Sequence, residues 1–179
     1  MNPKLELRRQ LIERRLQISP QRRNAARAAM MEQLLPKLEG FKRILSFASK
    51  DEEIDLWPLN EALAQEKRLF LTKVENESLS IFQVIDLELD LAETGRWKLK
   101  EPIPSRCKKV VPNEIDCVLV PGLGFDAECH RIGYGMGHFD RFLPQVSCPT
   151  YGVGFQEQRL ETPLPVEKHD ISLTKVFYF

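Results

Sequence analysis

The sequence feature that most constrains the fold is a short apolar run between positions 115 and 120. It reads Ile115-Asp116-Cys117-Val118-Leu119-Val120 and ends at Pro121-Gly122. Polar and apolar residues do not alternate from Cys117 onward, so a strand formed here would be buried on both faces of a sheet. Sheets buried on both faces are covered by helices on both sides. The run therefore predicts a central strand in a layered α/β structure.

Two helices are predicted before the first strand. Asn2-Pro3 and Ser19-Pro20 each place a capping residue before a proline, which is the usual order at a helix start. Apolar residues recur at helical spacing after both pairs. We therefore expect one helix over about 3–17 and a second from 20 to a glycine stop at Gly40.

Short apolar segments alternate with helical ones along the rest of the chain. The pattern predicts strands at 43–48, 68–72, 79–85, 115–120, 150–155 and 174–179, with helices at 59–67 and after Phe139. This alternation favours a mostly parallel sheet between helical layers. Because the 179 residues contain no repeat or long linker, we expect one three-layer α/β domain over residues 1–179, with two N-terminal helices.

Composition excludes several functional classes. Basic and acidic residues number 26 each, so a general polyanion binder is not expected. Residues 1–43 nevertheless hold 11 basic and 4 acidic residues, which leaves an RNA-binding module open as an alternative. The longest apolar stretch, 118–125, is far shorter than the roughly 20 residues that span a bilayer, and the N-terminus has no apolar leader. We expect a cytoplasmic protein without a membrane or nucleic-acid partner.

The cysteines give no metal or redox pattern. Cys107, Cys117, Cys129 and Cys148 form no C-x-x-C pair, so neither a zinc site nor a dithiol is predicted. Cys117 is expected to be a small core residue, because it lies in the central apolar run.

The segment after the central strand carries the predicted chemistry, since open α/β sheets bind ligands beyond the carboxyl ends of their strands. It reads Arg131-Ile132-Gly133-Tyr134-Gly135-Met136-Gly137-His138-Phe139-Asp140-Arg141. Glycines at alternate positions permit positive φ and let backbone N–H groups surround an anion such as phosphate. Asp140 has the chemistry to hold Mg²⁺ against that phosphate. The spacing fits neither the Walker nor the dinucleotide-binding pattern, so a purely structural turn also remains open.

The same segment resembles the signature of the 5-formyltetrahydrofolate cyclo-ligases, also called methenyltetrahydrofolate synthetases. Other blocks resemble that family in order and spacing: Lys4-Leu5-Glu6-Leu7-Arg8, Glu53-Ile54-Asp55, 97–102, Gly152-Val153-Gly154-Phe155 with Gln158, and 164–170. The resemblance implies a ligase that uses ATP and Mg²⁺ to cyclise 5-formyltetrahydrofolate to 5,10-methenyltetrahydrofolate, releasing ADP and phosphate. In that chemistry the formyl oxygen is phosphorylated, substrate N10 closes the ring, and phosphate leaves.

The resemblance also implies roles for individual residues. ATP would be bound by Lys4, Arg8, Arg131, Ile132, Gly133, Tyr134, Gly135, Met136, Gly137, His138 and Phe139. The folate site would include Ala48, Glu53, Trp97, His138 and Phe139, and Mg²⁺ would be held by Asp140 and Asp170. No protein nucleophile is implied, and Arg131 is a candidate charge stabiliser. The implied partner is 5-formyltetrahydrofolate, with or without a polyglutamate tail, and the expected state is a monomer or weak homo-oligomer.

The chain departs from the family pattern at several positions. His138 and Phe139 stand where the family usually has two tyrosines, and Leu56 stands where it often has threonine. Tyr134 and Met136 fill places that are often basic in other members. These departures keep a second alternative open, a folate- or nucleotide-binding homologue that has lost catalysis.

Overall fold

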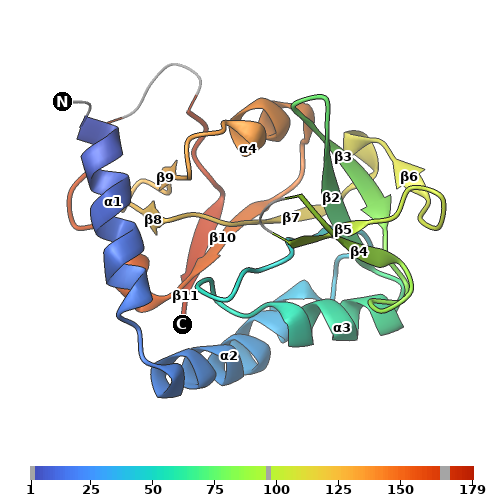
Figure 1. Cartoon of the computed structure of the whole chain (residues 1–179), viewed down its shortest axis with the longest axis horizontal. Helices are drawn as coiled ribbons and strands as arrows, with labels where there is room; N and C mark the ends of the chain where they lie inside the picture. The colour runs from blue at the N-terminus through green and yellow to red at the C-terminus, as the bar shows by residue number, and fades with distance from the viewer. Residues whose placement is uncertain (1–2, 96–97, 166–169) are drawn as a thin grey trace.

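The computed structural model describes residues 3–95, 98–165 and 170–179. Its centre is a seven-stranded sheet with the order β11-β10-β7-β1-β2-β3-β6 (Figure 1). The first five of these strands are parallel, whereas β3 and β6 join by antiparallel pairings at one edge. The predicted α/β fold, with a mostly parallel sheet flanked by helices and two N-terminal helices, is confirmed.

The elements have the following bounds. The helices are α1 (Pro3–Leu16), α2 (Pro20–Leu34), α3 (Trp57–Gln65) and α4 (His138–Phe142), with 3₁₀ turns at Leu35–Leu38, Pro112–Glu114, Leu143–Gln145 and Gln156–Gln158. The sheet strands are β1 (Ile44–Leu45), β2 (Leu69–Glu75), β3 (Ser78–Gln83), β6 (Lys109–Val110), β7 (Cys117–Val120), β10 (Thr150–Gly154) and β11 (Lys175–Tyr178). Two small hairpins pair β4 (Leu91–Thr94) with β5 (Leu99–Pro102), and β8 (Gly124–Phe125) with β9 (Arg131–Ile132).

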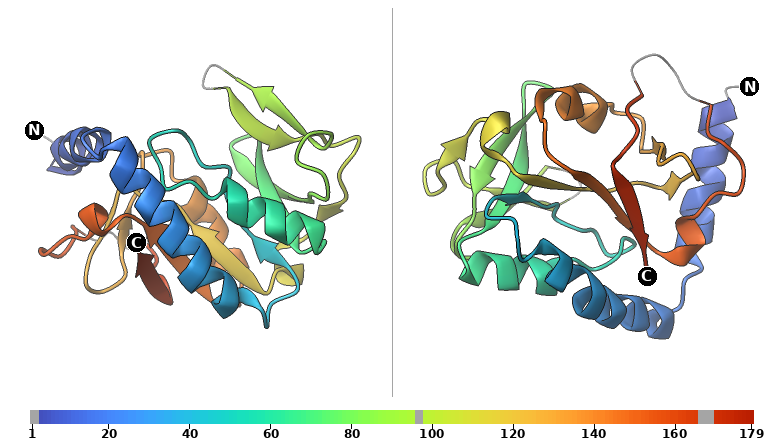
Figure 2. Two further views of the ribbon diagram at one scale, coloured as in Figure 1. Left: turned by 90° about the horizontal axis from the view of Figure 1, so that it is seen from below. Right: turned by 180° about the vertical axis from the view of Figure 1, so that it is seen from behind.

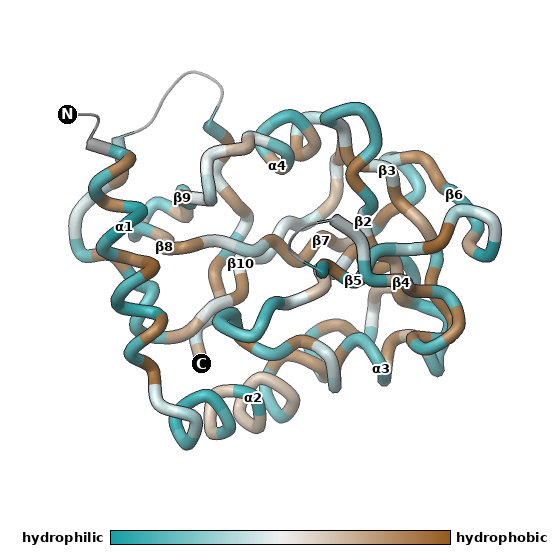
Figure 3. The backbone as a smooth tube through the Cα atoms, viewed as in Figure 1, coloured by the Kyte–Doolittle hydropathy of each residue, from teal (hydrophilic) through white to brown (hydrophobic). Residues whose placement is uncertain are grey.

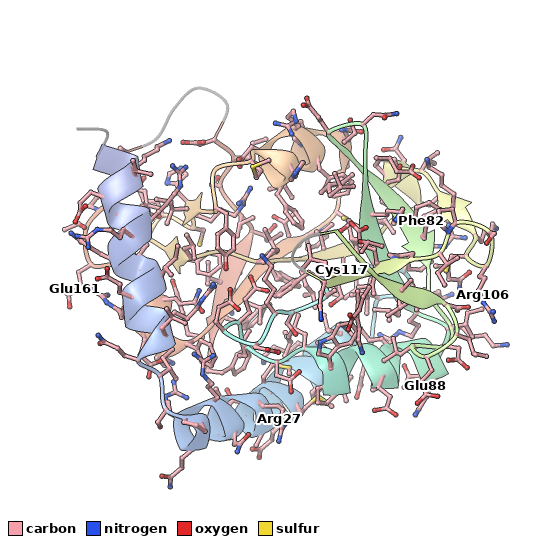
Figure 4. The ribbon with its side chains drawn as sticks, viewed as in Figure 1. Arg27, Phe82, Glu88, Arg106, Cys117 and Glu161 are labelled. Atoms are coloured by element: carbon pink, nitrogen blue, oxygen red, sulfur yellow. The ribbon has the colours of Figure 1, made fainter. Side chains whose placement is uncertain are left out.

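Both faces of the sheet are buried, as the central apolar run predicts. On one face, Cys117 and Leu119 of β7 pack with residues of α2 and α3. On the other face, Val118 and Val120 pack with Phe142 of α4. Figure 1 shows α2 and α3 along one side of the sheet and α4 along the opposite side. Cys117 is fully buried at the centre of the molecule (Figure 4), so its predicted place in the core is confirmed.

The start of the second helix is confirmed, but its predicted end is wrong. The hydroxyl of Ser19 accepts a hydrogen bond from the Arg22 N–H at 3.2 Å, as an N-cap should. The α-helix ends at Leu34 and tightens into the 3₁₀ turn Leu35–Leu38, well before Gly40. Pro36 explains the difference, because proline removes a helical hydrogen bond and its ring clashes with the preceding turn.

Helix α1 packs on the two short strands β8 and β9 rather than on the main sheet. Its residue Leu11 belongs to a separate apolar cluster that includes Leu123 and Ile132. The helix comes close because Gly124 has no side chain: a Cβ atom there would lie 3.1 Å from Leu11 Cδ1. In Figure 3, α1 alternates between hydrophilic and hydrophobic colour along its length, and Figure 2 shows the helix at one end of the molecule.

The strand order reverses between β1 and β7. The chain passes from β1 to its neighbour β2, whereas β7 is followed by β10 on its other side. At such a switch point the connections leave in opposite directions and open a crevice beyond the carboxyl ends of the strands. Residues 46–53 and 121–139 follow these two strands. Within the described ranges, no helix has the length and apolarity needed to cross a membrane.

Candidate functional site

Helix α1 contacts the glycine-rich segment that follows β7. The Nε atom of Arg8 donates a hydrogen bond to the carbonyl oxygen of Gly133 at 2.9 Å. One helical turn away, Lys4 Nζ lies 2.9 Å from Asp170 Oδ2, in the C-terminal part of the chain. The two α1 cations predicted to bind ATP therefore contact the other segments predicted to bind ATP and metal.

Each glycine between residues 133 and 137 lies against a different arginine. The pairs are Gly133 with Arg131, Gly135 with Arg8, and Gly137 with Arg141, and an added Cβ atom would lie 3.0, 3.3 and 2.9 Å from the respective guanidinium groups. Gly135 and Gly137 also have φ of +100° and +66°, which side chains rarely adopt. The glycines thus let three cationic groups approach the backbone of one loop. Guanidinium groups match phosphate oxygens well, so this loop suits a polyphosphate.

Arg131 links the loop to the two predicted metal ligands. Its Nη2 atom donates to Asp140 Oδ1 at 2.6 Å. The side chain is 6% exposed, and Nε has no hydrogen-bond partner among the described residues. Burial lowers the pKa of Arg131, whereas the charges of Asp140 and Asp170 act to raise it. Arg131 is thus a buried cation beside two carboxylates, with one donor left for a ligand.

Asp140 and Asp170 fit a magnesium ion that is shared with phosphate. In the part of the chain that the structure describes, no group of three or more His, Cys, Asp or Glu residues is placed to hold a metal by itself. Mg²⁺ usually takes only one or two carboxylates and completes its shell with phosphate oxygens and water. The donor set at this end of the loop matches that preference and does not form a protein-only metal centre.

Glu53 lies in the segment that follows β1, the other strand at the switch point. Its Oε2 atom accepts a hydrogen bond from the Lys50 N–H at 3.0 Å. The side chain is 9% exposed. Burial raises the pKa of Glu53, although the Lys50 N–H and the charges of Arg15 and Lys50 act to lower it. A buried carboxylate of this kind is suited to accept hydrogen bonds from a ligand.

Glu53 lines a pocket of 260 Å³ with residues of α2 and of the segment after β1. The lining includes Arg23, Asn24, Arg27, Lys50 and Trp57. Trp57 Nε1 donates to the Ser49 carbonyl oxygen at 3.1 Å, and this tryptophan also lines a neighbouring pocket of 530 Å³. The lining residues of both pockets come from outside the glycine-rich segment. Sequence reasoning missed Trp57, which carried no motif.

Tyr134 connects the glycine-rich segment with the segment that follows β1. Its hydroxyl donates to Glu52 Oε1 at 3.1 Å and is hydrogen-bonded to Arg15. Lys50 Nζ lies 4.6 Å from the centre of the Tyr134 ring. Burial raises the pKa of Tyr134 to about 12, so the phenol stays protonated at neutral pH. The glycine loop and the Glu53 segment are thus joined by direct side-chain contacts.

Arg15 is a site residue that sequence reasoning missed. It is 1% exposed and lies seven residues after Arg8 on the same face of α1. The spacing of Lys4, Arg8, Leu11 and Arg15 is the signal that would have found it, because residues at these intervals share one helix face.

The remaining predicted residues lie around this site with different surroundings. His138 Nδ1 lies 3.3 Å from the carbonyl oxygen of Glu77, in the turn between β2 and β3. The Phe139 ring centre is 5.5 Å from the Arg131 guanidinium carbon. Ile132 is buried in the α1 cluster, Met136 is exposed, and Ala48 is half-buried after β1. Trp97 lies outside the described residues.

Several basic residues of the N-terminal 43 positions pair with acidic residues of the same chain. Arg9 pairs with Glu6 and Glu13, Arg22 with Glu157, Arg27 with Asp55 and Arg43 with Glu114. Arg23 donates to the carbonyl oxygens of Arg15, Ile18 and Asp51. These partners reduce the charge that residues 1–43 can offer to an RNA backbone.

Comparisons with known proteins point to one family. The model of the 5-formyltetrahydrofolate cyclo-ligase family matches residues 1–179. A 5-formyltetrahydrofolate cyclo-ligase of Mus musculus is 27% identical over 149 residues, which are 76% of this chain and 73% of that protein. The solved 5,10-methenyltetrahydrofolate synthetase of Aquifex aeolicus has a TM-score of 0.85 and 31% identity, covering 97% of this chain and 88% of its own. That of Mycoplasma pneumoniae, with a TM-score of 0.77, 21% identity and 97% coverage of both chains, shares the fold.

Proposed function

The chain belongs to the 5-formyltetrahydrofolate cyclo-ligase family, and from that premise we propose that it converts 5-formyltetrahydrofolate and ATP to 5,10-methenyltetrahydrofolate, ADP and phosphate. The observation that carries the proposal is the direct contact between two unlike half-sites. One is a loop approached by three guanidinium groups, and the other is the buried carboxylate of Glu53. Tyr134 contacts both, so an anion and a heterocycle would be held side by side.

The polyphosphate of ATP would be held by the cationic loop. Arg8 and Arg131 provide guanidinium donors, and Gly135 and Gly137 leave the backbone accessible. Asp140 and Asp170 would hold Mg²⁺, which when bound neutralises phosphate charge during phosphoryl transfer. Each carboxylate is paired with a cation, Asp140 with Arg131 and Asp170 with Lys4. The positive charges of a shared ion and the negative charges of its phosphates would therefore be added to a site whose own charges are balanced.

The folate would be held at the Glu53 end. A pterin presents a ring N–H and a neighbouring amino group, and an ionised carboxylate can accept a hydrogen bond from each. Glu53 is buried beside two cations, Arg15 and Lys50, which favour its charged form once a ligand supplies donors. The N5 formyl group would then face the phosphate loop.

The reaction needs positioning more than a protein nucleophile. The formyl oxygen attacks the γ-phosphorus, and the bond to the β,γ-bridging oxygen breaks to release ADP. The N10 lone pair then attacks the formyl carbon, and the C–O bond breaks so that phosphate leaves with that oxygen while N10 loses its proton. Such transfers depend on alignment and charge stabilisation, and Arg131, beside Asp140, would provide the stabilising charge.

The test is the appearance of the methenyltetrahydrofolate absorbance band when the protein is mixed with 5-formyltetrahydrofolate, ATP and magnesium. We expect the band to form only when all three are present, and to be abolished by EDTA or by omission of ATP. Tight folate binding by calorimetry without any absorbance change would instead identify a binding homologue that has lost catalysis.

A further inference from the structure

The guanidinium group of Arg15 is buried beside Glu53 and is only partly satisfied. Its Nη2 atom is hydrogen-bonded to the Tyr134 hydroxyl and lies 3.5 Å from Glu52 Oε1. Its Nε and Nη1 atoms have no hydrogen-bond partner among the residues that the structure describes. Buried polar groups in native proteins nearly always have partners, so these donors are expected to meet a ligand or water in the working enzyme.

The Nη1 atom is the donor that faces the folate half-site. It lies 3.9 Å from Glu53 Oε1, too far for a hydrogen bond, so the two groups sit side by side without satisfying each other. A ligand held by Glu53 would therefore have its next polar atom close to Nη1. That atom must be an acceptor, because a guanidinium group can only donate.

The chemistry of a pterin edge supplies this acceptor. The ring N–H and the amino group that suit Glu53 are followed along the same edge by the oxygen at position 4. Resting on the proposed function, we propose that Arg15 is a substrate-binding residue whose Nη1 donates a hydrogen bond to the 4-oxo oxygen of the reduced pterin. Glu53 and Arg15 together would then match a donor-donor-acceptor edge.

The position of Arg15 in α1 supports a role in binding. Lys4, Arg8 and Arg15 lie on one helix face, the first two against the predicted metal and phosphate segments and the third against Glu53. The Tyr134 hydroxyl accepts a hydrogen bond from Nη2 of Arg15, and the Glu52 carboxylate lies beside the same atom. These two contacts orient the guanidinium group, while Nη1 remains without a hydrogen-bond partner among the described residues. A single helix would thus align the phosphate end and the pterin end of the site.

The test compares a 4-oxo ligand with a 4-amino ligand. Replacing the 4-oxo oxygen also removes the proton from the neighbouring ring nitrogen, so each ligand is compared with itself between the unmodified and the variant protein. Calorimetry without ATP would measure the dissociation constants of 5-formyltetrahydrofolate and of its counterpart with an amino group in place of the 4-oxo oxygen. In Arg15→Met we expect the 4-oxo ligand to bind at least about tenfold more weakly, which corresponds to about 1.4 kcal/mol. The 4-amino ligand should bind as well as before or better. Its 4-amino group is a hydrogen-bond donor and cannot pair with the guanidinium group, which also only donates.

Arg14→Met is the matched control, since Arg14 is the exposed neighbour on another face of α1. It should leave both dissociation constants unchanged. If Arg15→Met does not fold, Arg15→Lys carries the same comparison, because it keeps a donor and a charge and should retain part of the preference for the 4-oxo ligand.

The outcomes separate this proposal from the proposed function. Equal loss of both ligands in the Arg15 variants, or no loss of either, would show that Arg15 is structural and overturn the proposal. Failure of the unmodified protein to bind 5-formyltetrahydrofolate at all would instead contradict the proposed function.

Discussion

The guanidinium carbon of Arg8 lies 3.3 Å from the position that a Cβ atom would take at Gly135. Arg8 also donates to the Gly133 carbonyl, so the helix and the loop are in direct contact on both sides of residue 134. A side chain at position 135 would have to displace the guanidinium group and would also resist a φ of +100°. The shape of the loop and the position of the arginine therefore depend on each other.

Gly135→Val should weaken ATP binding by about tenfold or more, because it moves Arg8 and distorts the backbone around the phosphate. Binding of 5-formyltetrahydrofolate without ATP should change little. Calorimetry with ATP and with folate measures both effects. Gly95→Val is the matched control: Gly95 also has a positive φ, +66°, but a Cβ atom there meets nothing within 4 Å. Equal nucleotide affinity in the two variants would contradict a phosphate loop.

Asp140→Asn should lower turnover by about a hundredfold and raise the magnesium concentration needed for activity. Asparagine keeps an oxygen that can accept from Arg131 but loses the charge that attracts the ion. The fold should be unaffected, as judged by thermal unfolding. Glu161→Gln removes an exposed carboxylate elsewhere on the surface (Figure 4) and serves as the control. Near-normal turnover of Asp140→Asn at an unchanged magnesium requirement would remove Asp140 from the metal site.

The parts of the fold that the sequence predicts best are those set by local chemistry. The start of α2 follows from Ser19, whose side chain caps its own helix, and β7 follows from an apolar run that can only be buried. The pairing partners are not local. β1 has only two residues in the ladder, against a predicted span of six, because its extent depends on how far β2 and β7 run beside it. The β4–β5 hairpin was not predicted, since its residues are polar and half-exposed.

The candidate site also combines features that local sequence predicts with features that depend on distant residues. The glycine loop is visible in the sequence, because glycines at alternate positions predict either an anion-binding loop or a tight structural turn. Arg15 is one of many basic residues in α1, and the residues beside its guanidinium group, Glu52 and Tyr134, are distant in the sequence. Glu53 likewise has acidic neighbours at 51, 52 and 55, and it is distinguished by its distant cation, Arg15, 3.9 Å away. Long-range contacts, which the sequence does not specify locally, decide which charges lie at the candidate site.

Folate affinity should increase with pH through a pKa above 4.5. Burial raises the pKa of Glu53 above this ordinary value. Below the raised pKa the carboxyl group holds a proton and cannot accept two hydrogen bonds, whereas above it the ionised group can. The dissociation constant of 5-formyltetrahydrofolate, measured by calorimetry from pH 4 upward, should therefore fall and then level off. Glu53→Gln should abolish this step, whereas Glu32→Gln, at an exposed carboxylate of α2 outside the pocket, should preserve it. An identical pH profile in Glu53→Gln would exclude Glu53 as the titrating group.

Gln158 should be the polar side chain on which the segment after β7 most depends for stability. It is 3% exposed, accepts from the Phe155 N–H at 2.8 Å and donates to the Gly122 carbonyl oxygen at 2.7 Å. Gln158→Leu keeps the bulk but leaves both backbone groups buried and unpaired, at a cost of roughly 1–3 kcal/mol each. Urea denaturation should therefore show a loss of about 2–6 kcal/mol.

Gln156→Leu is the control for this loss, because the Gln156 amide is exposed and makes one long hydrogen bond, 3.4 Å, to the Tyr178 carbonyl oxygen. It should change the free energy of unfolding by less than about 0.5 kcal/mol. Gly122 begins the connection from β7 to the glycine loop, so Gln158→Leu should also weaken ATP binding at temperatures where the protein is still folded. Equal unfolding midpoints for the two variants would mean that water pairs with the Phe155 N–H and the Gly122 carbonyl oxygen in Gln158→Leu. The position of the glycine loop would then not depend on Gln158.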